Sequence, residues 1–184
     1  MGVSITELLG LVAGALDRER IDFLLIGGMA MSVWVEPRLT KDCDIVVKVR
    51  KTDQARLKVG LVAAGARATS LEMRLLFERP FIRFKTTGGP ILDVHRCLTA
   101  HDRSAFDHSV KLEKWGHTFR VATPEDLVLY KLQAWRPQDR IDIQSLLSQV
   151  RDLDRTYIES WLDRIRESTN EPMWDRWSDS LRGL

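Results

Sequence analysis

The chain has 184 residues, of which 44% are hydrophobic and 29% charged, a balance typical of a globular domain and not of a disordered segment. Its 28 basic and 26 acidic side chains leave a net charge of +2, a balance that argues neither for nor against nucleic acid and mildly disfavours a large RNA interface. Two cysteines form no disulfide framework, the amino terminus lacks a signal-peptide pattern, and no apolar run approaches the roughly 20 residues that span a bilayer. We therefore expect a cytoplasmic protein without a membrane partner.

Apolar spacing and capping residues predict the elements of the first 122 residues. A capping box at Ser4–Glu7 begins the first helix, and Gly65 ends the third. The predicted helices cover about residues 4–18, 29–34, 53–64 and 71–77, and the predicted strands cover 22–26, 43–49, 81–85 and 91–95. The last two strands are expected to form an antiparallel hairpin across Gly88-Gly89-Pro90.

The pattern is weakest over residues 101–118, where only 110–112 and 118–121 favour short strands around Gly116. From Thr123 onward it becomes helical, because Thr123 can cap a helix with proline at its first position. Three more helices are expected, one from Pro137, one over 154–166 and one over 171–181. The sequence thus predicts an α/β core over residues 1–122 and a C-terminal helical region over 123–184, an α+β protein with a small mixed sheet flanked by helices.

Two carboxylates lie one residue apart at the start of the second predicted strand. Side chains alternate along a strand, so Asp42 and Asp44 point to the same face, and Cys43 between them points into the core. Asp93 lies between Leu92 and Val94 in a later strand and should point opposite to both. Carboxylates that meet in this way repel unless a cation lies between them, and Mg²⁺ is commonly held by a few carboxylates together with substrate phosphates.

A glycine pair supplies a possible anion-binding turn just upstream. Gly27 and Gly28 lie between a predicted strand and a predicted helix, where backbone N–H groups and the helix dipole favour a negative charge. Glycine also permits close approach of a ligand because it has no Cβ. The turn is not a Walker motif, because the spacing and the lysine of that motif do not occur.

These motifs, in this order, resemble the nucleotidyltransferase superfamily, whose minimal fold is that of DNA polymerase β. The pattern consists of the Gly-Gly turn in Ile26-Gly27-Gly28-Met29-Ala30, the acids in Arg38-Leu39-Thr40-Lys41-Asp42-Cys43-Asp44-Ile45, and the third acid in Leu92-Asp93-Val94. The back half is similar to the AbiEii-type branch, which includes toxins of type IV toxin–antitoxin systems. The stretches that carry this resemblance are Ala122-Thr123-Pro124-Glu125-Asp126-Leu127 and Lys131-Leu132-x-Ala134-x-Arg136-Pro137-x-Asp139-Arg140-x-Asp142-Ile143.

The resemblance implies transfer of an NMP group from an NTP, with Mg²⁺ or Mn²⁺ as cofactor and release of pyrophosphate. It implies that Asp42 and Asp44 hold the metal and that Asp93 holds metal or acts as a base, with Lys131 on the phosphates and Asp139 completing the site. On the nucleotide side the implied residues are Gly27, Gly28, Thr40 and Lys131. The acceptor stays open between tRNA, a protein hydroxyl and a small molecule such as an antibiotic, and an antitoxin is an implied partner.

Each candidate also has a plain structural interpretation. The acids could form a solvated strand end or a surface salt bridge, the glycines a simple turn, Lys131 a solvated helix lysine, and Asp139 a favourable first-turn acid. Arg83 and Lys85 could border the pocket, although solvated strand residues are the simpler interpretation. The rival function is that of a non-catalytic protein, which keeps the nucleotidyltransferase fold but binds or regulates a partner.

Overall fold

A computed structural model describes residues 2–183 of the chain. It divides into two compact units, each described here by itself. The sheet unit comprises the residues up to 29 together with 39–122, and the helical unit comprises 30–38 together with the residues from 123 onward.

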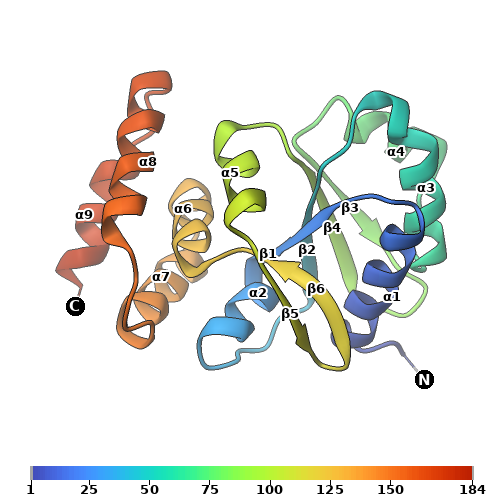
Figure 1. The fold of residues 1–184 in the computed structure, drawn as a ribbon, viewed down its shortest axis with the longest axis horizontal. Coiled ribbons are helices and arrows are strands. Elements are labelled where there is room, and N and C mark those ends of the chain that lie inside the picture. The colour runs from blue at the N-terminus through green and yellow to red at the C-terminus, as the bar shows by residue number, and fades with distance from the viewer. Residues whose placement is uncertain (1, 184) are drawn as a thin grey trace. The chain divides into compact units, whose positions relative to one another are not determined.

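Within the described residues, the sheet unit is built on six strands in the order β3-β4-β2-β1-β6-β5 (Figure 1). The strands are β1 (Phe23–Ile26), β2 (Asp42–Val47), β3 (Phe81–Lys85), β4 (Ile91–Arg96), β5 (Val110–Lys114) and β6 (His117–Val121). The sheet is mixed: β2 is parallel to β4 and β1 to β6, while the β1–β2, β3–β4 and β5–β6 pairs are antiparallel. The β3–β4 pair confirms the predicted hairpin.

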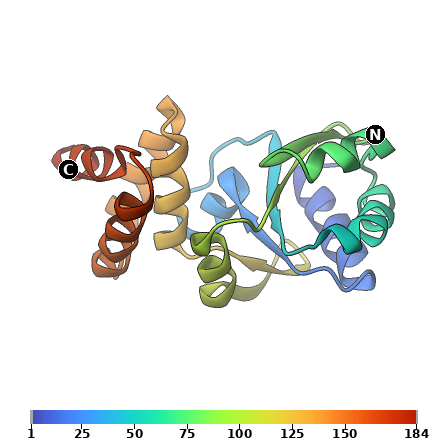
Figure 2. The ribbon, with the colours of Figure 1, turned by 90° about the horizontal axis from the view of Figure 1, so that it is seen from above.

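The helices of the sheet unit are α1 (Ile5–Arg18), α3 (Gln54–Ala63), α4 (Ser70–Leu76) and α5 (Ala100–His108). Helix α1 begins with the predicted capping box and buries Leu8, Leu9, Val12 and Leu16, which recur at helical spacing. It packs against α3 and against β2 and β6, and Figure 2 shows α1 and α3 side by side. Helix α4 covers β3 and β4.

Two local predictions differ from the structure. Thr52 does not cap the third helix; a short 3₁₀ turn, Lys51–Asp53, precedes α3 instead. Residues 100–108, which the sequence left without an assignment, form α5. Its start is a capping box in which Thr99 Oγ1 accepts from the Asp102 amide and Asp102 accepts from the Thr99 amide, a signal visible in the sequence as Thr99-x-x-Asp102.

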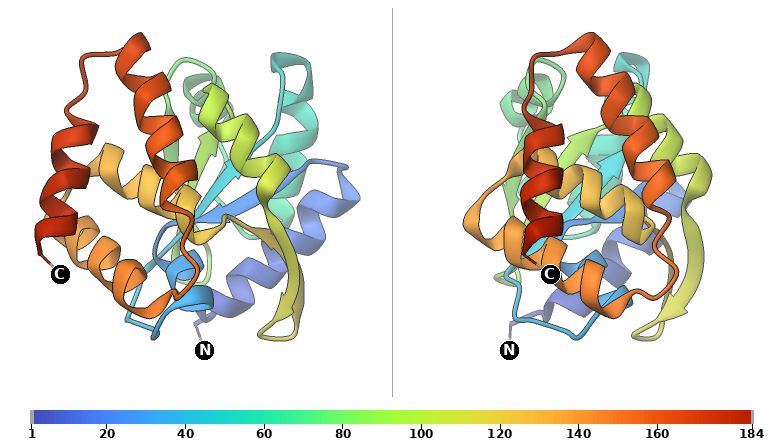
Figure 3. Two further views of the ribbon diagram at one scale, coloured as in Figure 1. Left: turned by 60° about the vertical axis from the view of Figure 1, so that its left-hand side comes forward. Right: turned by 90° about the vertical axis from the view of Figure 1, so that its left-hand side faces the viewer.

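The helical unit is an assembly of α6 (Pro124–Ala134), α7 (Pro137–Gln149), α8 (Arg155–Ser168) and α9 (Met173–Arg182) (Figure 3). Helices α6 and α9 each contact the other three helices of the unit. Thr123 caps α6 as predicted, with its hydroxyl accepting from the Asp126 amide. Trp177 is buried and its indole N–H donates to Glu159, so this tryptophan docks within the unit. Helix α2 (Gly27–Trp34) begins in the sheet unit and ends in the helical unit.

None of the helices between residues 2 and 183 is both long enough and apolar enough to cross a lipid bilayer.

The alternation of β3 can be tested because Phe84 and Phe81 point to opposite faces of one strand. Phe84 is 0% exposed and Phe81 is 45% exposed. We expect Phe84→Ala to lower the free energy of unfolding by about 3–5 kcal/mol through loss of buried contacts and formation of a cavity. Phe81→Ala, the control, should cost about 1 kcal/mol or less. Urea denaturation measures both, and equal losses would contradict the observed register of β3.

Candidate functional site

The three acids singled out in the sequence come from two adjacent parallel strands. Asp42 and Asp44 begin β2, and the β2–β4 register sets Asp44 directly opposite Asp93. Paired positions in neighbouring strands share a face of the sheet, so the carboxylates of Asp44 and Asp93 lie on one face, together with that of Asp42. We call Asp42, Asp44 and Asp93 the carboxylate cluster.

Gly27 makes room for this cluster. Strand β1 runs antiparallel to β2 with Ile26 opposite Asp44, so Gly27 follows at the level of the Asp44 side chain. A Cβ on Gly27 would lie 2.2 Å from Asp44 Oδ2, and the φ of +68° at Gly27 is a left-handed conformation that other residues rarely adopt. The glycine is therefore required both by the backbone turn and by the carboxylate beside it.

Arg83 on the edge strand β3 supplies a positive charge to the carboxylate cluster. Its Nε donates to Asp93 Oδ1 at 2.9 Å and its Nη2 to Asp93 Oδ2 at 2.7 Å, and Nη2 also lies 3.2 Å from Asp42 Oδ2. The hydrogen bonds to Asp93, followed by the charge of Asp93, raise the pKa of Arg83. Arg83 is therefore both a half-exposed strand residue and the partner of a two-pronged ion pair with Asp93, the opposite residue of β4.

The three carboxylates suit a hard divalent ion, since carboxylate oxygens are the ligands that Mg²⁺ prefers. The missing Cβ of Gly27 leaves the room that the Asp44 carboxylate occupies. As they stand, however, no three His, Cys, Asp or Glu side chains in residues 2–183 converge into a metal-binding arrangement. The assignment of Asp42, Asp44 and Asp93 as metal ligands thus stays a prediction.

Cys43 and Thr40 border the cluster along the chain. Cys43 is fully buried, as the strand alternation predicted, and burial raises the pKa of its thiol, so it packs in the core and is not a ready nucleophile. The Thr40 hydroxyl donates to the backbone carbonyl of Asp42 at 3.3 Å. The predicted contact of Thr40 with nucleotide stays a prediction.

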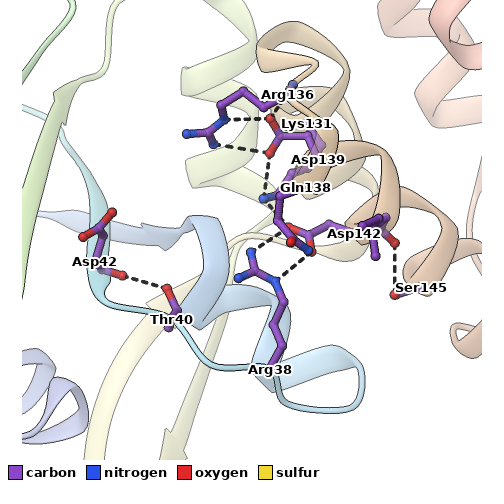
Figure 4. Close-up of polar contacts among 10 residues, drawn as sticks. Arg38, Thr40, Asp42, Lys131, Arg136, Gln138, Asp139, Asp142 and Ser145 are labelled. Atoms are coloured by element: carbon purple, nitrogen blue, oxygen red, sulfur yellow. Dashed lines mark hydrogen bonds and ion pairs between the residues drawn. The ribbon is translucent and has the colours of Figure 1, made fainter.

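A second group of charged side chains lies in the helical unit, where Lys131 of α6 meets two acids of α7 (Figure 4). Lys131 Nζ donates to Asp139 Oδ1 at 3.0 Å and to Asp142 Oδ2 at 2.6 Å. Lys131 is 5% exposed and both acids are buried as well. We call Lys131, Asp139 and Asp142 the helical ion cluster. The interpretation of Lys131 as a solvated lysine is wrong, whereas its predicted contact with phosphate stays a prediction.

Two arginines and a glutamine surround the helical ion cluster. Arg38 binds Asp142 through Nε at 2.8 Å and Nη2 at 2.9 Å, and Gln138 donates to the same carboxylate. Arg136 donates its backbone N–H and its Nε to Asp139. Figure 4 shows these side chains converging on the start of α7.

The balance of burial and pairing keeps both acids of the helical ion cluster charged. Burial raises the pKa of each, but this effect is outweighed. Hydrogen bonds from Arg136 and the charge of Lys131 lower the pKa of Asp139. Hydrogen bonds from Arg38, Lys131 and Gln138 lower that of Asp142. Asp139 and Asp142 are therefore both ionised at neutral pH.

Sequence reasoning assigned no role to Asp142, Arg38 or Gln138. Asp142 follows Asp139 by three residues on a helix, so both acids share one face of α7, and this spacing was available as a signal. Arg38 lies more than a hundred residues before Asp142 in the chain, and no local pattern predicts their contact.

The sequence and the fold were compared with known proteins. A family model described as "Nucleotidyl transferase AbiEii toxin, Type IV TA system" matches residues 11–176. No curated protein matches the sequence of the chain.

Three solved structures share the fold at low sequence identity. The solution structure of the antibiotic-resistance factor ANT(2'')-Ia is 13% identical, with a TM-score of 0.64 over 100% of both chains. An antigenic nucleotidyltransferase-like protein from Paracoccidioides brasiliensis is 19% identical, with a TM-score of 0.53 over 99% of this chain and 95% of its own. The lincosamide antibiotic adenylyltransferase LnuA, bound to lincomycin, is 15% identical, with a TM-score of 0.55 over 82% of this chain and 100% of its own. The predicted nucleotidyltransferase fold is thereby confirmed.

The helical ion cluster makes a prediction about stability. Lys131→Met removes the cation that Asp139 and Asp142 share and leaves two buried carboxylates side by side. We expect a loss of about 3 kcal/mol in the free energy of unfolding, because Asp139 and Asp142 lose the buried cation between them and keep only the more exposed Arg136 and Arg38 as partners.

Lys111→Met, at an exposed position of β5, is the control and should change stability by about 0.5 kcal/mol or less. Chemical denaturation at neutral pH compares the two variants. A Lys131→Met protein as stable as this control would show that the buried ion pairs do not hold α6 and α7 together.

Proposed function

Because the chain belongs to the AbiEii family of nucleotidyltransferases, we propose that it transfers an NMP group from an NTP to an acceptor and releases pyrophosphate. The chain is a nucleotidyltransferase by family and by fold, which favours the enzyme over the non-catalytic alternative. The metal, the nucleotide and the acceptor are the parts of the proposal that need experiment.

One observation carries the proposal: the β2–β4 register brings Asp44 opposite Asp93, with Asp42 on the same face. Three carboxylates on adjacent strands repel one another and are costly to keep together unless they serve a cation. We propose that Asp42 and Asp44 bind Mg²⁺ or Mn²⁺, with Asp93 as a further ligand. When bound, such an ion would neutralise charge on the phosphates and orient the triphosphate.

The glycine turn would bind the phosphates. Gly27 and Gly28 open helix α2, so their backbone N–H groups lie at the positive end of that helix. The absence of side chains on both residues lets a phosphate approach the backbone closely. Thr40 is the residue that we expect beside them on the nucleotide side.

Asp93 is the candidate base for the acceptor hydroxyl. Both of its oxygens accept hydrogen bonds from Arg83, so the acceptor hydroxyl would have to reach a lone pair that Arg83 leaves open. Asp93 as a ligand would face the same requirement. The role of Asp93 is thus tied to the position of Arg83.

Lys131 and Asp139 are proposed, from the resemblance, to complete the nucleotidyl-transfer machinery. Lys131 Nζ donates to two carboxylates and would need to exchange one of them for a phosphate oxygen in order to bind nucleotide. The part of the proposal that concerns Lys131 and Asp139 rests on the family pattern and not on the carboxylate cluster.

The acceptor is proposed by class. LnuA is an antibiotic adenylyltransferase and ANT(2'')-Ia an antibiotic-resistance factor, which supports a hydroxyl of a small molecule. The family description, a toxin of a type IV system, supports a cellular macromolecule such as tRNA or protein, with an antitoxin as the regulatory partner. A cytoplasmic location is the setting we expect for either acceptor.

Transfer of label from α-³²P-NTPs tests the proposed reaction. Each NTP is incubated separately with the protein, Mg²⁺ and either cell extract or a panel of aminoglycosides and lincosamides. We expect one NTP to label an acceptor, and Asp44→Asn to lower the rate at least 100-fold because the ion loses a charged ligand. The fraction that carries label, whether RNA, protein or antibiotic, identifies the acceptor class.

Asp22→Asn is the matched control, since Asp22 is an exposed carboxylate just before β1, at the opposite end of that strand from Gly27. It should label the acceptor at the wild-type rate. Labelling by Asp44→Asn at the wild-type rate would contradict the assignment of the site. If calorimetry with Mg²⁺ or Mn²⁺ detects no binding of any NTP, the proposed reaction is wrong.

A further inference from the structure

Arg83 places a positive charge on the same carboxylates that the proposed function assigns to the divalent ion. We propose that Arg83 is a positioning residue that competes with this ion for the carboxylates of Asp42 and Asp93. It would thereby set the ion concentration at which the carboxylate cluster is loaded. The inference rests on the proposed function, because it concerns the same three acids.

The register of the edge hairpin holds Arg83 in this position. Strands β3 and β4 pair antiparallel with Arg83 opposite Asp93, so the two side chains share one face of the sheet. The guanidinium then meets Asp93 with two parallel hydrogen bonds, an arrangement that fixes both the distance and the orientation of the carboxylate. The third contact, to Asp42, connects β2 to the same cation.

The ion and the guanidinium compete through charge and through oxygen atoms. A divalent ion bound by Asp93 would lie about 2 Å from an oxygen that already accepts from Arg83. Two cations so close together repel strongly, even where a carboxylate has lone pairs for both. Loading of the cluster therefore requires Arg83 to withdraw from at least one of its acids.

Arg83 is the partner that can move. Its side chain is 54% exposed and stands on β3 at the edge of the sheet, whereas the Asp93 side chain is 6% exposed and stands on the inner strand β4. A withdrawn guanidinium is readily hydrated, while a buried carboxylate cannot exchange its partner for bulk water. The structure thus combines a fixed anion with a displaceable cation.

The competition has a second effect on the acids. Until an ion binds, Arg83 offsets the repulsion between Asp42 and Asp93 and holds both carboxylates in the direction of the site. Removing the guanidinium should therefore make the cluster a stronger binder of cations and a less well-ordered one. The affinity of the protein for the ion measures the stronger binding directly and does not depend on catalytic activity.

Mn²⁺ binding, measured from the electron paramagnetic resonance signal of the free ion, tests the inference in the absence of nucleotide. Arg83→Gln removes the charge and keeps a polar side chain of similar reach. We expect it to bind Mn²⁺ about tenfold more tightly than the wild type, since the competing charge-assisted hydrogen bonds are gone. Lys85→Gln is the matched control, because Lys85 is an exposed cation two residues along on the same face of β3.

Lys85→Gln removes the same charge at a distance of about 7 Å along the strand. If direct competition operates, its Mn²⁺ affinity stays within about twofold of the wild type at 0.15 M salt, because an exposed charge without a direct hydrogen bond to the carboxylates acts on them only weakly through solvent. An equal increase in Mn²⁺ affinity in Arg83→Gln and Lys85→Gln would overturn the proposed competition, because it would show that only the overall positive charge near the cluster matters. Unchanged or weaker binding by Arg83→Gln would also overturn it.

Arg83→Lys is the conservative variant and keeps the charge without the two-pronged contact. Its Mn²⁺ affinity should fall between those of the wild type and Arg83→Gln, and it decides the question alone if circular dichroism shows Arg83→Gln to be unfolded. Affinity equal to or weaker than the wild type would then overturn the inference. Absence of Mn²⁺ binding in every protein would instead overturn the metal site of the proposed function, and the inference with it.

Discussion

The parallel pairing of β2 with β4 is the constraint on which the candidate site depends. A slip of one residue in that register would turn Asp93 away from Asp44 and toward the core, where its charge would have no partner. The apolar residues Cys43, Ile45, Leu92 and Val94 are all buried, so core burial fixes the register and carries the acids with it. The face of the sheet that carries the three acids is thus determined by the hydrophobic face behind it.

Two ion clusters in this chain solve the problem of crowded carboxylates in different ways. The helical ion cluster is buried, and every acid in it has at least two cationic partners, a solution suited to permanent structure. In the carboxylate cluster, Asp42 and Asp93 share the guanidinium of Arg83, whose side chain is half exposed. Because its cation can leave at modest cost, the carboxylate cluster is suited to exchange one positive charge for another.

Local sequence patterns predicted many of the helices and strands, whereas they did not predict the ion pairs between residues that are distant in the chain. A capping box located α1, an N-cap threonine before proline located α6, and turn residues located the β3–β4 hairpin. Strand alternation predicted the burial of Cys43. The ion pair of Arg83 with Asp93 depends on the register of a hairpin, and that of Arg38 with Asp142 joins distant segments, so neither has a signature within one window of sequence. The order of the glycines and acids pointed to the family because these residues belong to several different strands of the sheet.

The most direct test of a metal-dependent transfer site is the position of the ion itself. A crystal of the protein soaked with Mn²⁺ and a non-hydrolysable NTP can be measured at the manganese absorption edge for anomalous scattering. We predict an anomalous peak within about 2.3 Å of carboxylate oxygens of both Asp42 and Asp44, with the triphosphate beside Gly27 and Gly28. Manganese bound elsewhere, or nucleotide bound with Arg83 still on both acids and no metal between them, would contradict this account.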